Sequence, residues 1–147
     1  MCLSLQRQCS CGGDVASLFH MNSILPEEVV VAVHCPACSD QVAFNEATMI
    51  RDNGWIIEYD LELAARHLRR HGIAPDTLTP QRIFDEGYSS WNGLTPTDAY
   101  DKSMELQALW AESQGDRRKY FENTKKWTME RTQRLAAAGW RKAGLAL

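Results

Sequence analysis

The chain lacks the long apolar runs that would place it in a membrane. No stretch approaches the roughly 18 consecutive apolar residues of a membrane-spanning helix. The first residues, MCLSLQRQCSC, have neither the basic start nor the apolar stretch of a secretory signal. We therefore expect a cytoplasmic protein that makes no use of a membrane.

The sequence also lacks the motifs of the common enzyme classes. It contains no nucleophile elbow, no P-loop and no dinucleotide fingerprint, and the Gly12-Gly13 pair alone is too little for phosphate binding. Carboxylates are abundant, but no pattern pairs two of them as acid and base. Catalysis has no positive support, and a non-enzymatic role is the working expectation.

What is present is an ordinary globular composition. The chain has 147 residues, of which 44% are hydrophobic and 24% charged. Such a chain fits one domain, or a small metal-stabilised module followed by a helical part. Two compositional halves meet near residue 60, so we predict a β module over residues 1–59 and a helical region over residues 60–147.

Five cysteines argue for metal binding. A reducing compartment disfavours disulfides, and an odd number would leave one thiol unpaired. Four of the cysteines form two close pairs, Cys9-Ser10-Cys11 and Cys35-Pro36-Ala37-Cys38. Two tight turns carrying four thiolates suit one tetrahedral Zn²⁺, and a closed set of four ligands makes the site structural. Iron in an electron-transfer site and buried thiols without metal remain the alternatives.

The second pair resembles a known type of metal-binding turn. Its Cys-Pro-x-Cys sequence resembles the knuckle of the zinc-ribbon and rubredoxin-like families, and Cys9-Ser10-Cys11-Gly12 resembles a shortened partner knuckle. The resemblance covers about residues 9–59 and implies a ribbon whose ligands are Cys9, Cys11, Cys35 and Cys38. Ribbons occur in nucleic-acid binders, enzyme subunits and adaptors, so the resemblance implies no single function.

Histidines offer weaker metal candidates. His67 and His71 share a helix face at i and i+4, although two arginines beside them would repel a cation. His34, next to Cys35, could replace a cysteine ligand or donate a hydrogen bond to a thiolate. Cys2 lies outside both pairs and is interpreted as a bystander.

The expected fold is α+β, with an N-terminal antiparallel zinc ribbon of three or four strands followed by three to five helices. Strands are predicted within 14–20, 29–33, 41–44 and 55–59, and the Asn53-Gly54 pair indicates a hairpin. Helices are predicted from Asp60 to a stop at Gly72 and from Pro80 to about residue 86.

A longer helical stretch follows Thr95. Its apolar spacing weakens at Gly115, so the two parts could pack as an antiparallel hairpin or continue as one helix.

Charge is distributed very unevenly along the chain. Residues 1–116 hold 7 Lys and Arg against 17 Asp and Glu, whereas residues 117–147 hold 9 against 2. The basic segment could pair with the acidic part of its own chain or with an acidic partner. Aromatic residues lie among its charges, so stacking on single-stranded nucleic acid is a further hypothesis.

The first functional hypothesis is a zinc-binding accessory protein or subunit that docks a protein partner, or another copy of itself, through its C-terminal helices. Aromatic anchors with basic neighbours are the candidate contacts: Trp110, Arg117, Arg118, Tyr120, Phe121, Lys125, Lys126 and Trp127. The alternatives are a nucleic-acid-binding regulator and a rubredoxin-like iron protein.

Overall fold

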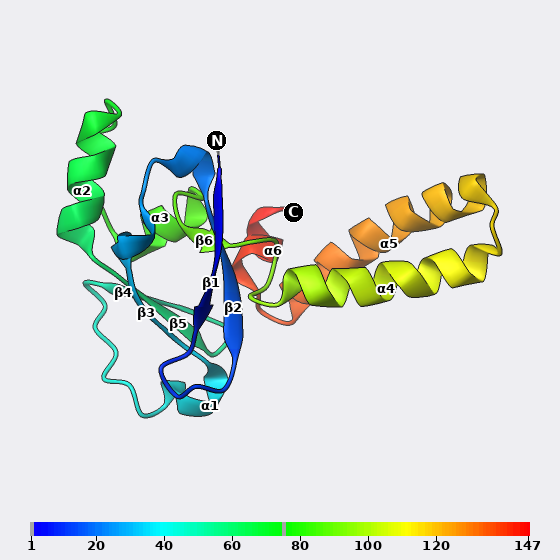
Figure 1. The fold of residues 1–147 in the computed structure, drawn as a ribbon, viewed down its shortest axis with the longest axis horizontal. Helices are drawn as coiled ribbons and strands as arrows, with labels where there is room; N and C mark the ends of the chain where they lie inside the picture. Colours follow the sequence, from blue (N-terminus) through cyan, green and yellow to red (C-terminus); the bar gives the residue numbers. More distant parts are fainter. Residues whose placement is uncertain (1, 75) are drawn as a thin grey trace.

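The computed structural model describes residues 2–74 and 76–147, which form a β-rich body with a long helical arm projecting from it (Figure 1). The fold is α+β, as predicted. The strands are β1 (Leu3–Gln8), β2 (Val15–His20), β3 (Val30–His34), β4 (Met49–Asp52), β5 (Trp55–Tyr59) and β6 (Ser90–Trp91). The α-helices are α1 (Pro36–Ser39), α2 (Leu61–Arg70), α3 (Pro80–Asp85), α4 (Asp98–Ser113), α5 (Arg117–Ala137) and α6 (Arg141–Leu145).

The strands form two three-stranded antiparallel sheets rather than one ribbon of three or four strands. One sheet has the order β1-β2-β6 and the other the order β3-β5-β4. The predicted strands at 14–20, 29–33 and 55–59 are confirmed as β2, β3 and β5. The strand predicted over residues 41–44 is wrong, because this segment is an irregular turn in which Phe44 is exposed beneath the Arg51 guanidinium.

The turn between β4 and β5 is the hairpin that Asn53-Gly54 predicts. Asp52 pairs with Trp55 across it, and both central residues have positive φ, 48° at Asn53 and 91° at Gly54. Asparagine and glycine are the residues that adopt this conformation at least cost, which is why the pair is typical of tight hairpins. The turn therefore fixes the register of the second sheet.

The helices predicted from Asp60 and from Pro80 are confirmed as α2 and α3, and a side chain caps each of them. The Asp60 carboxylate accepts a hydrogen bond from the Leu63 N–H at the start of α2, and the Thr79 hydroxyl accepts one from the Arg82 N–H at the start of α3. Each cap satisfies a donor that a helix N-terminus leaves free. The chain reverses after α2 at Gly72, whose φ is 73°.

The arm is an antiparallel hairpin of α4 and α5, which resolves the choice left open by the sequence. Gln114 and Gly115 both have positive φ, 52° and 85°, and end α4 abruptly. The Asp116 carboxylate then accepts a hydrogen bond from the Lys119 N–H and starts α5. Among the described residues, no helix is both long and apolar enough to cross a bilayer.

One hydrophobic core joins residues from both of the predicted regions. Val33 and Ile57 of the second sheet belong to the same cluster as Leu68 of α2 and Phe84 of α3, and Trp140 packs against it from the segment before α6. The chain therefore leaves the body after β6, forms the arm, and returns to complete the core. The division at residues 59 and 60 stays a prediction.

Candidate metal centre and helical arm

The four predicted cysteines converge on one point at the end of the two sheets. The sulfurs of Cys9, Cys11, Cys35 and Cys38 all lie within 4.8 Å of one another. The Cys9 and Cys38 sulfurs are 3.2 Å apart, and those of Cys11 and Cys35 are 3.5 Å apart. Four thiols at this separation surround a volume in which one metal ion could bind all of them.

Two tight turns position these thiols. In the first, the Cys9 N–H donates to the Asp14 carbonyl and the Gly12 N–H donates to the Cys9 carbonyl, at 2.8 and 2.9 Å. In the second, the N–H of Cys38 donates to the Cys35 carbonyl at 3.1 Å. Each turn folds its two cysteines toward the same side. The short spacing within each pair therefore lets both of its thiols point at the same site.

Further contacts join the turns to each other and to the sheets. The Cys35 N–H donates to the Cys9 sulfur at 3.1 Å, a bond that stabilises a thiolate. Ser10 and His34 are linked between the hydroxyl and Nδ1 at 3.0 Å. A Cβ at Gly54 would lie 3.3 Å from Pro36, so the β4–β5 turn presses closely on the second cysteine turn. The site is thus built on strand ends and a hairpin rather than on a free loop.

The hydrogen bonds among the thiols shift the pKa values of Cys9 and Cys38 in opposite directions. Burial alone would raise the pKa of the Cys9 thiol, but hydrogen bonds from the Cys11 and Cys35 N–H groups and from the Cys38 thiol lower it to about 6. The hydrogen bond to Cys9, together with burial, raises the pKa of Cys38 to about 12. A thiolate at Cys9 therefore disfavours ionisation of the Cys38 thiol. A divalent cation among them would neutralise this repulsion and allow all four to deprotonate.

The other metal candidates do not join this cluster. Among the described residues, the group with metal-ligand spacing comprises the four cysteines alone. His34 is bonded to Ser10 beside the cluster, and Cys2 is exposed elsewhere. The His71 Nδ1 donates to the His67 backbone carbonyl at 2.9 Å, which leaves that nitrogen unable to bind a metal.

The candidate partner contacts lie on the arm, mostly near its far end. Trp110 is on α4 and is 48% exposed; its ring meets that of Tyr120 edge to face, with centroids 5.1 Å apart. Phe121 is 65% exposed beside them. Trp127 is half-buried nearer the body, where the Arg131 guanidinium lies over its ring. The predicted basic contacts Arg117, Arg118, Lys125 and Lys126 are all exposed on α5.

A buried ion-pair network at the base of the arm was not apparent from the sequence. Arg131 of α5 bonds through its guanidinium to the carboxylates of Asp98 and Glu105 on α4. Arg134 bonds to the second oxygen of Glu105 at 2.7 Å. Hydrogen bonds to Arg134 and Arg131 overcome the effect of burial and lower the pKa of the Glu105 carboxyl. These pairs hold the two helices together where the arm meets the body.

A second network attaches the returning chain to the body. Arg141 binds Asp85 through two guanidinium nitrogens, at 2.5 and 2.7 Å. The buried Asp52 carboxylate accepts from the Arg141 backbone N–H and from the Trp91 indole. The Lys142 amine donates to the Trp91 carbonyl. Polar contacts therefore hold the base of the arm at two places: between α4 and α5, and between α6 and the body.

The cysteine cluster beside N-terminal antiparallel strands is consistent with a metal knuckle. Comparisons with protein-family models, with curated proteins and with solved structures found no match for this chain. Its function is therefore inferred from its own residues.

Proposed function

We propose that the chain binds one structural zinc ion through Cys9, Cys11, Cys35 and Cys38 and acts as a non-enzymatic accessory protein or subunit that docks a protein partner on its arm. The observations that carry this proposal are the convergence of four thiols within 4.8 Å in the body and the helical hairpin that projects from that body. The metal would stabilise the folded body, and the arm would bind the partner protein.

The donor set favours zinc. Four thiolates in a tetrahedron leave no coordination position for water or substrate, which suits a structural ion. The two turns also fit the zinc-ribbon type of knuckle, in which backbone N–H groups point at the sulfurs, as the Cys35 N–H does here. Iron would occupy the same thiolates, so the choice between the two metals is one for measurement.

Metal analysis tests the first half of the proposal. Protein purified without added metal is expected to contain one equivalent of zinc by mass spectrometry and to show no visible absorbance. Stoichiometric iron with a coloured, reversible redox couple would replace this assignment with a rubredoxin-like one. Protein that is folded and free of any metal would refute the metal site altogether.

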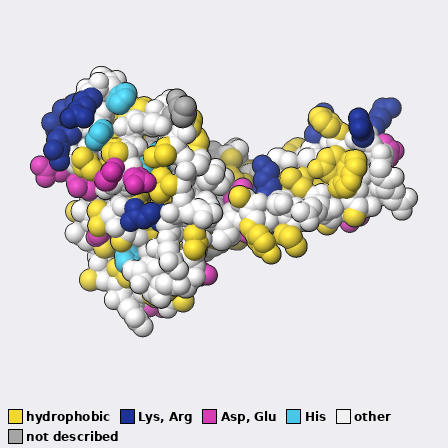
Figure 2. All heavy atoms as spheres, viewed as in Figure 1, with side chains coloured by type: hydrophobic (Ala, Val, Ile, Leu, Met, Phe, Trp, Pro, Cys, Tyr) yellow, Lys and Arg dark blue, Asp and Glu magenta, His cyan; other side chains and the backbone are white. Residues whose placement is uncertain are grey.

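The shape of the molecule supports the docking half of the proposal. Figure 2 shows hydrophobic side chains gathered along the projecting arm and basic side chains toward its far end. Half of the large hydrophobic residues that are exposed in the described chain lie on α4 and α5: Tyr100, Met104, Trp110, Phe121 and Met129. Trp110, Tyr120 and Phe121 lie together near the far end of the arm, and an exposed apolar patch with a polar rim is typical of protein interfaces.

Site-specific photo-cross-linking tests the docking role. A photoreactive amino acid at Phe121 is expected to give a protein adduct in cells that make the chain, whereas the same group at Met129 is expected to give little. Both positions are on α5 and equally exposed, at 65% and 66%. Met129 lies nine residues after Tyr120, about two and a half turns on, and faces away from α4. Absence of any protein adduct at Phe121 would count against the docking role.

Nucleic-acid binding is the second candidate, and the charge of α5 favours it. Five basic residues near the far end of the helix are exposed: Arg117, Arg118, Lys119, Lys125 and Lys126. The Lys125 amine lies over the Phe121 ring, which places a cation beside an aromatic surface suited to stacking. A nucleic-acid adduct at Phe121, with affinity that falls steeply as salt is raised, would favour this candidate over a protein partner.

A further inference from the structure

We infer that the partner on the arm is a second copy of the same chain, bound through the face of the α4–α5 hairpin that carries Leu106, Trp110, Tyr120 and Phe121. This inference rests on the proposed docking role of the arm and specifies its occupant. The two hairpins would pack face to face around a two-fold axis and form a four-helix bundle between the two bodies.

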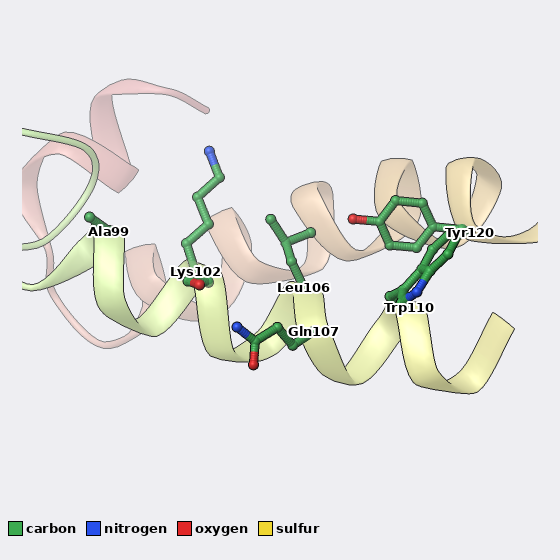
Figure 3. A pocket seen from close by; sticks show the side chains of 7 residues that line it. Ala99, Lys102, Leu106, Gln107, Trp110 and Tyr120 are labelled. Carbon is green, nitrogen blue, oxygen red and sulfur yellow. The ribbon is translucent and has the colours of Figure 1, made fainter. Parts of the chain in front are cut away.

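The face carries a shallow groove made of two hollows that share Tyr120. The hollow along α4 has a volume of about 440 Å³ and is lined by Ala99, Lys102, Ser103, Leu106, Gln107, Trp110 and Tyr120. In Figure 3 these side chains follow one another along α4, and Trp110 lies against Tyr120 of α5. Ala99, Ser103, Leu106 and Trp110 are spaced by four, three and four residues, the spacing of a helix seam that packs on other helices.

The α5 side of the groove is a row of threonines with their hydroxyls satisfied. The hydroxyls of Thr124, Thr128 and Thr132 donate to the carbonyls of Tyr120, Thr124 and Thr128, at 2.7 to 2.9 Å. Each hydroxyl already donates within the helix. Burying these threonines against another helix would therefore leave no hydroxyl donor without an acceptor.

The arm has no apolar core of its own. Of its described residues 98–137, only Asp98, Ser113 and Arg131 are buried, and all three are polar. Leu106, Leu109 and Leu135 are only partly buried. Helices in water gain most of their stability from packing an apolar face, and this pair leaves much of its apolar surface in solvent. A second pair of helices would supply the missing half of the core.

The size of the face suits a stable dimer. With a rise of about 1.5 Å per residue, α4 and α5 are about 24 and 31 Å long, and two helices side by side are about 20 Å wide. Their footprint is on the order of 500–600 Å², and the ridged accessible surface is larger. It therefore approaches the roughly 800 Å² that each partner buries in a standard interface.

The charges favour an antiparallel arrangement of two copies. The far part of each arm, residues 106–126, holds 5 Lys and Arg against 3 Asp and Glu, whereas residues 1–97 hold 6 against 12. Antiparallel arms would place the net positive part of each arm beside the acidic body of the other copy. At the base of the arm, a hollow lined by Val15, Pro96, Ala99 and Tyr100 continues the same groove through Ala99 and would face the partner's aromatic end.

Sedimentation equilibrium of the zinc-loaded full chain tests the inference. The wild-type protein is expected to be a dimer at micromolar concentrations. Phe121→Glu is expected to weaken dimerisation by at least about 100-fold, because symmetry places the buried charge in the interface twice. Met129→Glu is the matched control on the outer face and should leave the dimer unchanged. Phe121 is exposed within one chain, so its replacement should preserve zinc content and helicity.

The outcomes separate this inference from the docking role beneath it. A monomeric wild type, or a dimer that Phe121→Glu leaves intact, would overturn the second-copy assignment. A monomer that still cross-links to a different protein through position 121 would overturn it and retain the docking role. A monomer with no protein adduct at all would count against both.

Discussion

Replacing Cys35 by Ser is expected to abolish stoichiometric metal binding and to lower the free energy of unfolding by several kcal/mol. Cys35 is 1% exposed, and its N–H and carbonyl organise both cysteine turns through bonds to Cys9 and Cys38. Structural zinc contributes about 10–16 kcal/mol in peptides that fold only with metal. The loss should be smaller here because the body has its own hydrophobic core.

Cys2→Ser is the matched control for this variant. Cys2 is exposed and lies outside the cluster, so its replacement should change neither metal content nor stability. Denaturation should be followed by far-ultraviolet circular dichroism and by tryptophan fluorescence together. The shared core favours simultaneous loss of both signals in Cys35→Ser, whereas loss of the fluorescence transition alone would support separable regions. Full metal content in Cys35→Ser would contradict the proposed ligand set.

Arg131→Ala is expected to cost about 3–5 kcal/mol, because it leaves a buried carboxylate without its partner. Asp98 and Arg131 are each 5% exposed, and their side chains are 2.5 Å apart. Gly93 lies against Asp98 so closely that any side chain there would collide with the carboxylate. The absence of a side chain at position 93 therefore leaves the space that the Asp98 carboxylate occupies. Urea denaturation gives the change, and amide exchange along α4 and α5 should locate it in the arm.

Arg118→Ala provides the comparison at a surface ion pair. The Arg118 side chain is 90% exposed and its partner Glu122 is 68% exposed, so we expect a change within about 0.5 kcal/mol. A double variant, Asp98→Asn with Arg131→Met, should recover part of the loss because no unpaired charge remains buried. Similar costs for Arg131→Ala and Arg118→Ala would show that the buried pair contributes no more than a solvated one.

The elements with local signals could be predicted from the sequence. The helix starts at Asp60 and Pro80 and the Asn53-Gly54 turn depend on residues within a short segment, and the structure confirms each of them. The cysteine cluster was predictable for a related reason, since two close pairs of thiols rarely serve a purpose other than metal binding. For the helix starts and the turn, adjacent residues contain the physical cause; for the cysteines they define each pair, and the fold brings the two pairs together.

Elements that depend on distant partners were missed or misassigned. In β1, Leu3 and Leu5 alternate with polar residues, which is a short strand pattern. The strand is stabilised by its pairing with β2, which the local pattern does not show. β6 has two residues and exists because Trp91 pairs with Leu18. The alternation of Val42 and Phe44 suggests a strand, yet no neighbouring strand pairs with them among the described residues. The ion pair between Asp98 and Arg131 spans 33 residues, and nothing local marks it.

The position of the arm within the chain bears on how the protein folds. The Arg141 N–H bonds to Asp52, 89 residues earlier, and the Lys142 amine bonds to Trp91, 51 residues earlier. Joining segments so distant costs chain entropy that grows with the open loop between them. The α4–α5 hairpin is made of contacts between its own helices and brings its two ends together, so it shortens the effective loop that α6 must close. Closure of the hairpin should therefore precede docking of α6, and weakening the hairpin should slow completion of the core.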